Sequence, residues 1–296
     1  MAEKFNISIA YKKALHFAKT HYENFPVVSF LIPKELRKDI AIIYWFARFA
    51  DDLADEGEYT SQERITSLEK FELRFLDTIN QKFEADYDAA LYSTISTHRL
   101  DIKLFLDLIS AFIQDIKVTR YQTHEEVLEY CSRSANPVGR LLLQLFNVRE
   151  EEANIYSDNI CTALQLTNFY QDITIDYQKG RIYIPIGELD KFNVTESDIQ
   201  NSVININFQK LLKFQIERVQ EYFDIGYKLI PYLSGLFKYE ILLTIKGGET
   251  ILEKIKKNNY DVFNKRPVIS KKDFITILIT VLTNEIRFGK RNIEKK

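Results

Sequence analysis

ALQLTNFYQDITIDYQKGRIYIP, residues 163–185, is the most informative segment of the sequence. Polar side chains recur in it at spacings of three, four and four, within about 80° of arc on one helix face. They are Gln165, Asn168, Asp172 and Asp176. The remaining faces are apolar, so the pattern predicts a buried helix with a polar stripe. Lys179 and Arg181 follow directly, as candidate partners for phosphate oxygens, in a predicted loop or short extended segment over 177–185.

A second acidic cluster lies in FARFADDLADE, residues 46–56. Asp51 and Asp55 are four residues apart and share a helix face, and Arg48 and Asp52 lie within about 100° of arc of them. The preceding AIIYWF is strongly apolar, so these acids do not lie on an ordinary solvated face. Close carboxylates near a core repel one another, and a divalent cation removes the repulsion. Removing one carboxylate should therefore leave stability level or raise it.

One such cluster alone would fit an exposed helix face. Two clusters on apolar helices, each beside basic residues, favour magnesium ions held between two helices and gripping a diphosphate. Metal-assisted departure of diphosphate leaves a carbocation, which needs an apolar, aromatic-walled cavity that admits little water. The 21 Phe and 17 Tyr can supply that wall.

Helical periodicity dominates the rest of the chain. The predicted helices are 7–19, 34–56, 60–83, 86–97, 100–117, 124–147, 150–178, 205–230, 232–258 and 271–290. Three helix starts pair a hydroxyl residue with an acid three positions later: Thr60 with Glu63, Thr123 with Glu126, and Ser270 with Asp273. Pro137 should kink or break the helix that contains it. No flexible linker interrupts the pattern, which predicts a single all-α domain over 1–296.

Composition excludes several classes of protein. The formal net charge of −2 argues against a nucleic-acid partner. Cys131 and Cys161 form no CxxC pair, which disfavours a disulfide framework or a zinc site. The chain shows neither a signal-peptide pattern nor a run of about 18 apolar residues, so the expected compartment is the cytoplasm. The basic C-terminus, with Lys290, Arg291, Lys295 and Lys296, fits either a solvated helix end or a weak contact at the inner face of a membrane.

With these motifs in order, the sequence resembles the squalene and phytoene synthases, head-to-head prenyl synthases with the all-α isoprenoid-synthase fold. ADDLADE resembles the family's first aspartate motif and QLTNFYQDITIDYQKGRIYIP its second. RYQTHEEVLEYC, residues 120–131, resembles a third signature. The resemblance runs from about residue 14 to residue 270 and implies one helical bundle around a central apolar cavity.

The resemblance also implies roles for individual residues. Two or three Mg²⁺ ions would be held by Asp51, Asp52, Asp55, Asn168, Asp172 and Asp176. Residues facing the diphosphate or the cation would be Arg48, Tyr121, Tyr130, Gln165 and Gln171. Substrate would also be bordered by His21, Asn24, Phe25, Tyr44, Lys179, Arg181 and Gly248.

Several departures from the coupling enzymes of the family point to a subgroup. Tyr22 and Asn24 stand where the coupling enzymes have Ser-x-Ser, Gln171 replaces an Arg, and Gly248 replaces a Tyr. ENFP, SANPVGRL and YDVFNKRP resemble the hydroxysqualene synthases of bacterial hopanoid-type squalene synthesis. That resemblance implies ionisation of presqualene diphosphate, rearrangement and capture of water, without NADPH. It also implies pathway partners, a presqualene diphosphate synthase upstream and a squalene-forming flavoenzyme downstream. Exchanging Tyr for Gly at 248 should open room for water, with Gln171, Asn136 and Asn168 as its polar partners.

Two alternatives remain open. The first is another head-to-head prenyltransferase, making presqualene diphosphate, dehydrosqualene or phytoene. The second is a non-catalytic helical assembly factor that kept the fold; such a protein should have lost metal ligands, and here every candidate ligand is present.

Overall fold

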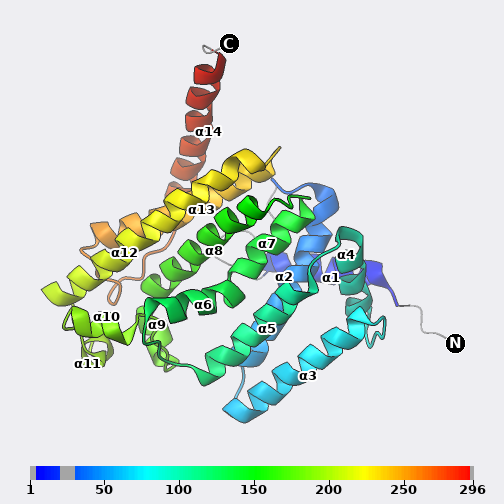
Figure 1. The fold of residues 1–296 in the computed structure, drawn as a ribbon, viewed down its shortest axis with the longest axis horizontal. Helices are drawn as coiled ribbons and strands as arrows, with labels where there is room; N and C mark the ends of the chain where they lie inside the picture. Colours follow the sequence, from blue (N-terminus) through cyan, green and yellow to red (C-terminus); the bar gives the residue numbers. More distant parts are fainter. Residues whose placement is uncertain (1–4, 21–30, 294–296) are drawn as a thin grey trace.

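A computed structural model describes residues 5–20 and 31–293, with side chains described as far as residue 283. Within these residues the chain is helical, without a named strand, and the one bridge joins Arg120 to Ile182. The predicted all-α fold is therefore confirmed (Figure 1). No helix in the described part combines the length and hydropathy needed to cross a bilayer.

The helices follow one another in the order seen in Figure 1. They are α1 (Ile7–Thr20), α2 (Lys34–Asp55), α3 (Ser61–Ile79), α4 (Asp86–His98), α5 (Ile102–Lys117), α6 (His124–Ser134), α7 (Asn136–Leu145), α8 (Glu151–Gln171), α9 (Ile173–Gln178), α10 (Ile186–Lys191), α11 (Glu196–Gln200), α12 (Ile206–Gly226), the 3₁₀ helix η1 (Tyr227–Tyr232), α13 (Phe237–Lys257) and α14 (Lys271–Ile293).

Local chemistry explains where several helices start. Thr60 forms the predicted capping box with Glu63, and Thr123 accepts a hydrogen bond from the backbone of Glu126. Ser270 and Asp273 satisfy each other's backbone N–H groups in the same way, at 2.6 and 3.2 Å. The three predicted helix starts are confirmed.

Two long predicted helices are divided. The break at Pro137 is confirmed, because α6 ends at Ser134 and proline occupies the first turn of α7, where its missing N–H costs nothing. The prediction of one unbroken helix over 150–178 is wrong, since the backbone turns at Asp172 (φ −111°, ψ 18°) between α8 and α9. The short helices α10 and α11 were not predicted, because five or six residues are too few to show a period of 3.6.

The core surrounds α8 and α2. The first packs against α6, α7, α12 and α13, and the second against α1, α3, α4, α5 and α7. Fully buried aromatic side chains such as Phe46, Phe105 and Phe223 fill the spaces between them. The two helices that carry the acidic motifs are thus interior elements, as their apolar faces predict.

Candidate active site

A cavity of about 700 Å³ lies among α2, α5, α6, α7, α8, α9 and α13. Its body is apolar, with Ile43, Leu108, Phe112 and Leu141 on the wall. Its other end is polar and carries side chains from both acidic motifs. Asp51 and Asp55 come from α2, Asn168 and Asp172 from the end of α8, and Asp176 from α9. Motifs more than 100 residues apart therefore meet at one end of a greasy cavity.

On α2, three of the four predicted polar side chains line the cavity: Arg48, Asp51 and Asp55. Arg48 also pairs with Asp51 at 3.2 Å and with Asp52 at 2.8 Å, and Asp52 itself does not line the cavity. Burial raises the pKa of Asp51 to about 6; Arg48 opposes this shift, and the charges of Asp55 and Asp52 add to it. The ionised form of Asp51 is therefore poorly stabilised by the protein alone.

On α8 and α9 the polar stripe faces the same space. The Asn168 amide donates to Asp172 Oδ2 at 2.8 Å, which fixes the orientation of that carboxylate. Asp176 has a buried oxygen, Oδ2, that makes no hydrogen bond. Burial and the charge of Asp172 raise the pKa of Asp176 to about 7. A buried carboxylate oxygen without a hydrogen bond, next to a second acid, is a position that a bound cation would stabilise.

Lys179 and Arg181 bridge the two motifs. Lys179 Nζ lies 2.6 Å from Asp55 Oδ2, and Arg181 Nη2 lies 2.7 Å from Asp55 Oδ1. Burial of Asp55 acts to raise its pKa, but these two cations hold that pKa below its ordinary value. Both side chains also line the cavity. Their ion pairs with Asp55 therefore connect the two motifs at the end of the cavity where diphosphate is predicted to bind. Their role as substrate-binding residues stays a prediction.

The donor set fits magnesium in its chemistry. Among the described residues, no three carboxylate, imidazole or thiol groups already lie close enough to hold one ion. Hard carboxylate and amide oxygens are nevertheless gathered at one cavity end, one of them buried without a partner. Asp51, Asp55, Asn168, Asp172 and Asp176 are the residues that would hold the ion, and Asp52, which faces Arg48, is placed less well.

Sequence reasoning missed a buried carboxylate on α5. Asp115 accepts hydrogen bonds from Tyr130 at 2.5 Å and from Tyr183 at 2.9 Å, and all three line the cavity. Tyr183 stacks on Phe169 with ring centroids 3.7 Å apart. Tyr121 packs behind these rings, buried and away from the cavity surface. Tyr121 is therefore placed to support Tyr183 and Tyr130 rather than to touch substrate, whereas Tyr44, Gln165 and Tyr130 lie on the wall.

Arg266 was also missed. Its guanidinium donates to both oxygens of Asp172, at 2.5 and 2.9 Å, from the segment between α13 and α14. The neighbouring Pro267 carbonyl accepts from the side-chain amide of Gln171. YDVFNKRP had pointed to this segment as a whole, but nothing local marked Arg266 as the residue that reaches Asp172.

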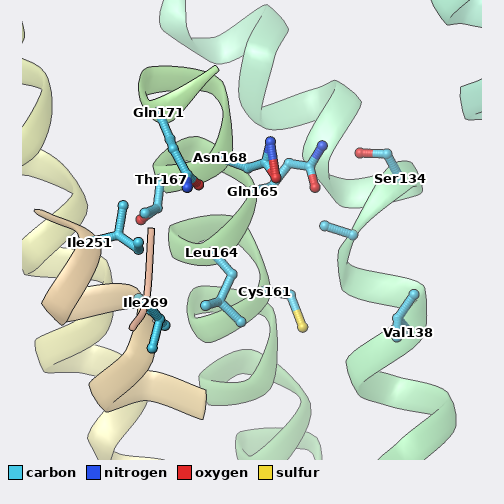
Figure 2. A pocket seen from close by; sticks show the side chains of 12 residues that line it. Ser134, Val138, Cys161, Leu164, Gln165, Thr167, Asn168, Gln171, Ile251 and Ile269 are labelled. Carbon is cyan, nitrogen blue, oxygen red and sulfur yellow. The ribbon is translucent and has the colours of Figure 1, made fainter. Parts of the chain in front are cut away.

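A smaller cavity of about 320 Å³ adjoins the first (Figure 2). Gln165, Asn168 and Ser134 line both spaces. Figure 2 shows Gln165 extending from α8 toward Ser134, with Asn168 beside it and Gln171 and Thr167 on the same helix. The hydroxyl oxygen of Ser134 is buried and makes no hydrogen bond. The lining of this second space is mostly apolar, but it is roomy enough for water, and Ser134, Gln165 and Asn168 offer that water polar partners.

The expectation about Gly248 needs correction. Gly248 does line the smaller cavity, but a Cβ there would lie 2.5 Å from Phe223 Cζ and 3.0 Å from Leu164 Cδ2. Phe223 of α12 occupies the direction in which a tyrosine side chain would start, so the exchange opens no phenol-sized space. Asn136 is also placed differently, because its side chain accepts from Thr162 and lines neither cavity.

Gly248→Ala is therefore expected to destabilise the protein by about 1–3 kcal/mol, because the ring of Phe223 must shift. Urea unfolding of the two proteins measures this. Gly180→Ala is a poor control because its φ of +80° disfavours any side chain, whereas Ser96→Ala, at an exposed position in α4, tests the method. A stability unchanged by Gly248→Ala would mean that Phe223 does not fill the site.

His21, Asn24 and Phe25 lie outside the described residues, so their predicted place beside the substrate stays a prediction.

Comparison with known proteins agrees with this geometry. Residues 18–273 match the family model for squalene/phytoene synthase. The chain is 30% identical over 276 residues to a 15-cis-phytoene synthase from Synechococcus elongatus, covering 89% of each, and 32% identical over 265 residues to one from Synechocystis, covering 86% of this chain and 77% of the relative. Among solved structures, it resembles squalene synthase HpnC from Alicyclobacillus acidocaldarius with a TM-score of 0.81 and 33% identity, over 86% of this chain and 96% of that one. A dehydrosqualene synthase has the same TM-score at 19% identity, which shows the shared fold. With a family match over most of its length and both aspartate motifs on one cavity, the chain belongs to the squalene/phytoene synthase family, whose members are head-to-head prenyl diphosphate synthases.

Proposed function

We propose that this protein ionises presqualene diphosphate, rearranges the resulting C30 cation and lets water capture it, giving hydroxysqualene and diphosphate. The family acts on prenyl diphosphates and depends on divalent metal. The apolar body of the 700 Å³ cavity suits the hydrocarbon, and its acidic end suits a metal-bound diphosphate.

Different residues would bind the diphosphate and stabilise the carbocation. When bound, magnesium would neutralise charge on the departing diphosphate. Lys179 and Arg181 lie at the same end and can donate hydrogen bonds to phosphate oxygens once Asp55 binds another cation. Tyr130, Phe169 and Tyr183 give the wall an aromatic surface that attracts a cation without reacting with it.

The adjoining smaller cavity, with its few polar side chains, is the observation that carries the choice of water as the terminating group. A cation in the main cavity would lie beside a space walled by Gln165, Asn168 and Ser134, whose hydroxyl oxygen has no protein partner. Water bound there could donate its oxygen lone pair to the cation and pass one proton to the departed diphosphate, which leaves the alcohol. This argument replaces the one based on Gly248, since that position is filled.

The reaction can be tested directly on its product. Purified protein is given presqualene diphosphate with Mg²⁺ in H₂¹⁸O, with and without NADPH. The expected product is an alcohol that carries the heavy oxygen, in the same amount with or without NADPH. Ser134→Ala should lower the ratio of alcohol to hydrocarbon, because one water partner is lost. A hydrocarbon as the main product, or squalene formed only with NADPH, would contradict water capture.

The second candidate is head-to-head coupling of two prenyl diphosphates, favoured by the 30–32% identity to the phytoene synthases. Separate incubations with farnesyl and geranylgeranyl diphosphate distinguish it, because a coupling enzyme consumes these and hydroxysqualene synthase does not. The upstream presqualene diphosphate synthase, the downstream flavoenzyme, the cytoplasmic location and a membrane contact through the basic C-terminus remain predictions.

A further inference from the structure

Basic side chains of the protein itself form ion pairs with the carboxylates at the acidic end of the cavity. Asp55 is held by Lys179 and Arg181, Asp51 is paired with Arg48, and Asp172 is held by Arg266. We propose that Arg266 acts as an internal counter-ion on Asp172 that competes with the metal, so that metal and diphosphate bind cooperatively.

Arg266 is well placed to compete with a metal. It contacts both oxygens of Asp172 in a fork, and the Asn168 amide occupies Oδ2 as well. The carboxylate is 10% exposed and the guanidinium side chain 39% exposed, so the arginine reaches a buried acid from the solvent side. Three of the roughly four lone-pair sites of this carboxylate are thus taken, and the positive guanidinium repels an incoming cation, so a metal competes with Arg266 for Asp172.

The contact also fastens a segment of chain. Arg266 and Pro267 belong to the connection between α13 and α14, and both meet consecutive residues of the second motif, Asp172 and Gln171. Within the described residues these are contacts across about 95 positions in sequence. Release of Asp172 therefore loosens one of the two hydrogen-bonded attachments between this connection and the end of α8.

A coupling between ligands follows from the charges. A metal that takes Asp172 leaves the guanidinium without its anion, which is unfavourable until another anion arrives. Diphosphate supplies that negative charge, and by linkage each ligand then strengthens the binding of the other by the same factor. In the absence of diphosphate, the metal should consequently bind weakly, although five candidate ligands line the cavity.

This inference rests on the proposed function only in assuming that the acidic end of the cavity binds a divalent cation and diphosphate. Its test uses binding, not turnover. Mn²⁺ serves as a spectroscopic substitute for Mg²⁺, and its free concentration is measured by electron paramagnetic resonance with full-length wild type, Arg266→Gln, Arg266→Lys and Arg140→Gln. Inorganic diphosphate is the anion, with correction for the complex that Mn²⁺ forms with it in solution.

Arg140→Gln is a matched control. Arg140 binds both oxygens of Asp158 with the same fork, at 2.9 and 2.6 Å, has a side chain 36% exposed, and lines neither cavity. This variant loses a comparable ion pair and one positive charge but keeps the contact with Asp172. It therefore shows how much of any effect comes from charge and stability alone. Thermal unfolding of each variant establishes that it is folded.

Without diphosphate, Arg266→Gln should bind Mn²⁺ roughly three- to tenfold more tightly than wild type, because the competing cation is gone. The coupling factor between Mn²⁺ and diphosphate should fall by a similar amount. Arg266→Lys should tighten Mn²⁺ binding less, since lysine cannot form the fork but keeps the charge; it also serves if Arg266→Gln does not fold. Arg140→Gln should match wild type.

Cooperative binding in wild type together with unchanged or weaker Mn²⁺ binding in both Arg266 variants would overturn the inference and leave the proposed function standing. If wild type bound Mn²⁺ neither alone nor with diphosphate, the metal site itself, and with it the proposed function, would be wrong. Equal tightening in Arg140→Gln would reduce the effect to general charge and would also overturn the inference.

Discussion

Asp172→Asn is expected to lower turnover of the prenyl diphosphate by roughly a thousandfold or more, because a carboxylate of the proposed metal site is lost. The sequence predicts that loss of a carboxylate from either acidic cluster leaves stability level or raises it, and for Asp172 the structure corrects this. Asp172→Asn should lower the free energy of unfolding by about 1–3 kcal/mol, since Arg266 loses its charged partner. Single-turnover kinetics with saturating Mg²⁺ and urea unfolding of the metal-free protein measure the two effects.

Asp51→Asn provides the contrast. Turnover should fall by a similar factor, but stability should rise, because burial makes the ionised form of Asp51 unfavourable and raises its pKa to about 6. Near-normal turnover in either variant would show that the two motifs do not form one site. Equal changes of stability in the two variants would show that the Arg266 contact contributes nothing to the fold.

Asp176→Asn is expected to change the stability of the metal-free protein in a way that depends on pH. The pKa of Asp176 is raised to about 7, so the folded protein binds a proton that the unfolded chain has already released above its ordinary pKa. The cost of ionising Asp176 is therefore absent only below its ordinary pKa of 3.8, has begun to appear at pH 5 and is nearly complete at pH 8. The variant should be more stable than wild type, and its advantage should be larger at pH 8 than at pH 5 by about 2–3 kcal/mol.

The comparison with wild type is needed because His124 acts in the opposite direction. Burial and Arg218 lower the pKa of His124 to about 4, so its contribution to stability grows as pH rises through the unfolded value. That contribution is the same in both proteins and cancels in their difference. Urea unfolding at pH 5 and pH 8 in the presence of a chelator gives the measurement. A difference that stayed constant with pH would mean that Asp176 is ionised throughout.

The sequence could predict the features that depend only on residues close together along the chain. Spacing alone placed Asp51 with Asp55, and Asn168 with Asp172, on their helix faces, and Pro137 marked a true break because proline acts on its own turn. The break at Asp172 carries no such local signal. The polar stripe survives it, because Asp176 still lines the cavity from α9.

What could not be predicted depends on contacts between distant segments. Asp115 has no acidic neighbour within four positions along the chain. Its place in the site depends on hydrogen bonds from tyrosines 15 and 68 positions away. Arg266 reaches Asp172 across 94 positions. Gly248 was misread for the same reason: a missing side chain indicates space only if no neighbour fills it, and Phe223 comes from another helix.

The carboxylate on α5 has a consequence for proton transfer. Tyr130 and Tyr183 both direct their phenolic hydrogens to Asp115, and burial raises the pKa of each phenol above its usual value. These hydroxyls can therefore neither protonate a departing oxyanion nor, as phenolates, remove a proton from a carbon skeleton. Along this part of the wall, the hydroxyl groups that a reactive intermediate would meet already donate to Asp115. A group with a free oxygen lone pair, such as Ser134 Oγ at the end of α6, is the kind of partner that would hold a water beside it.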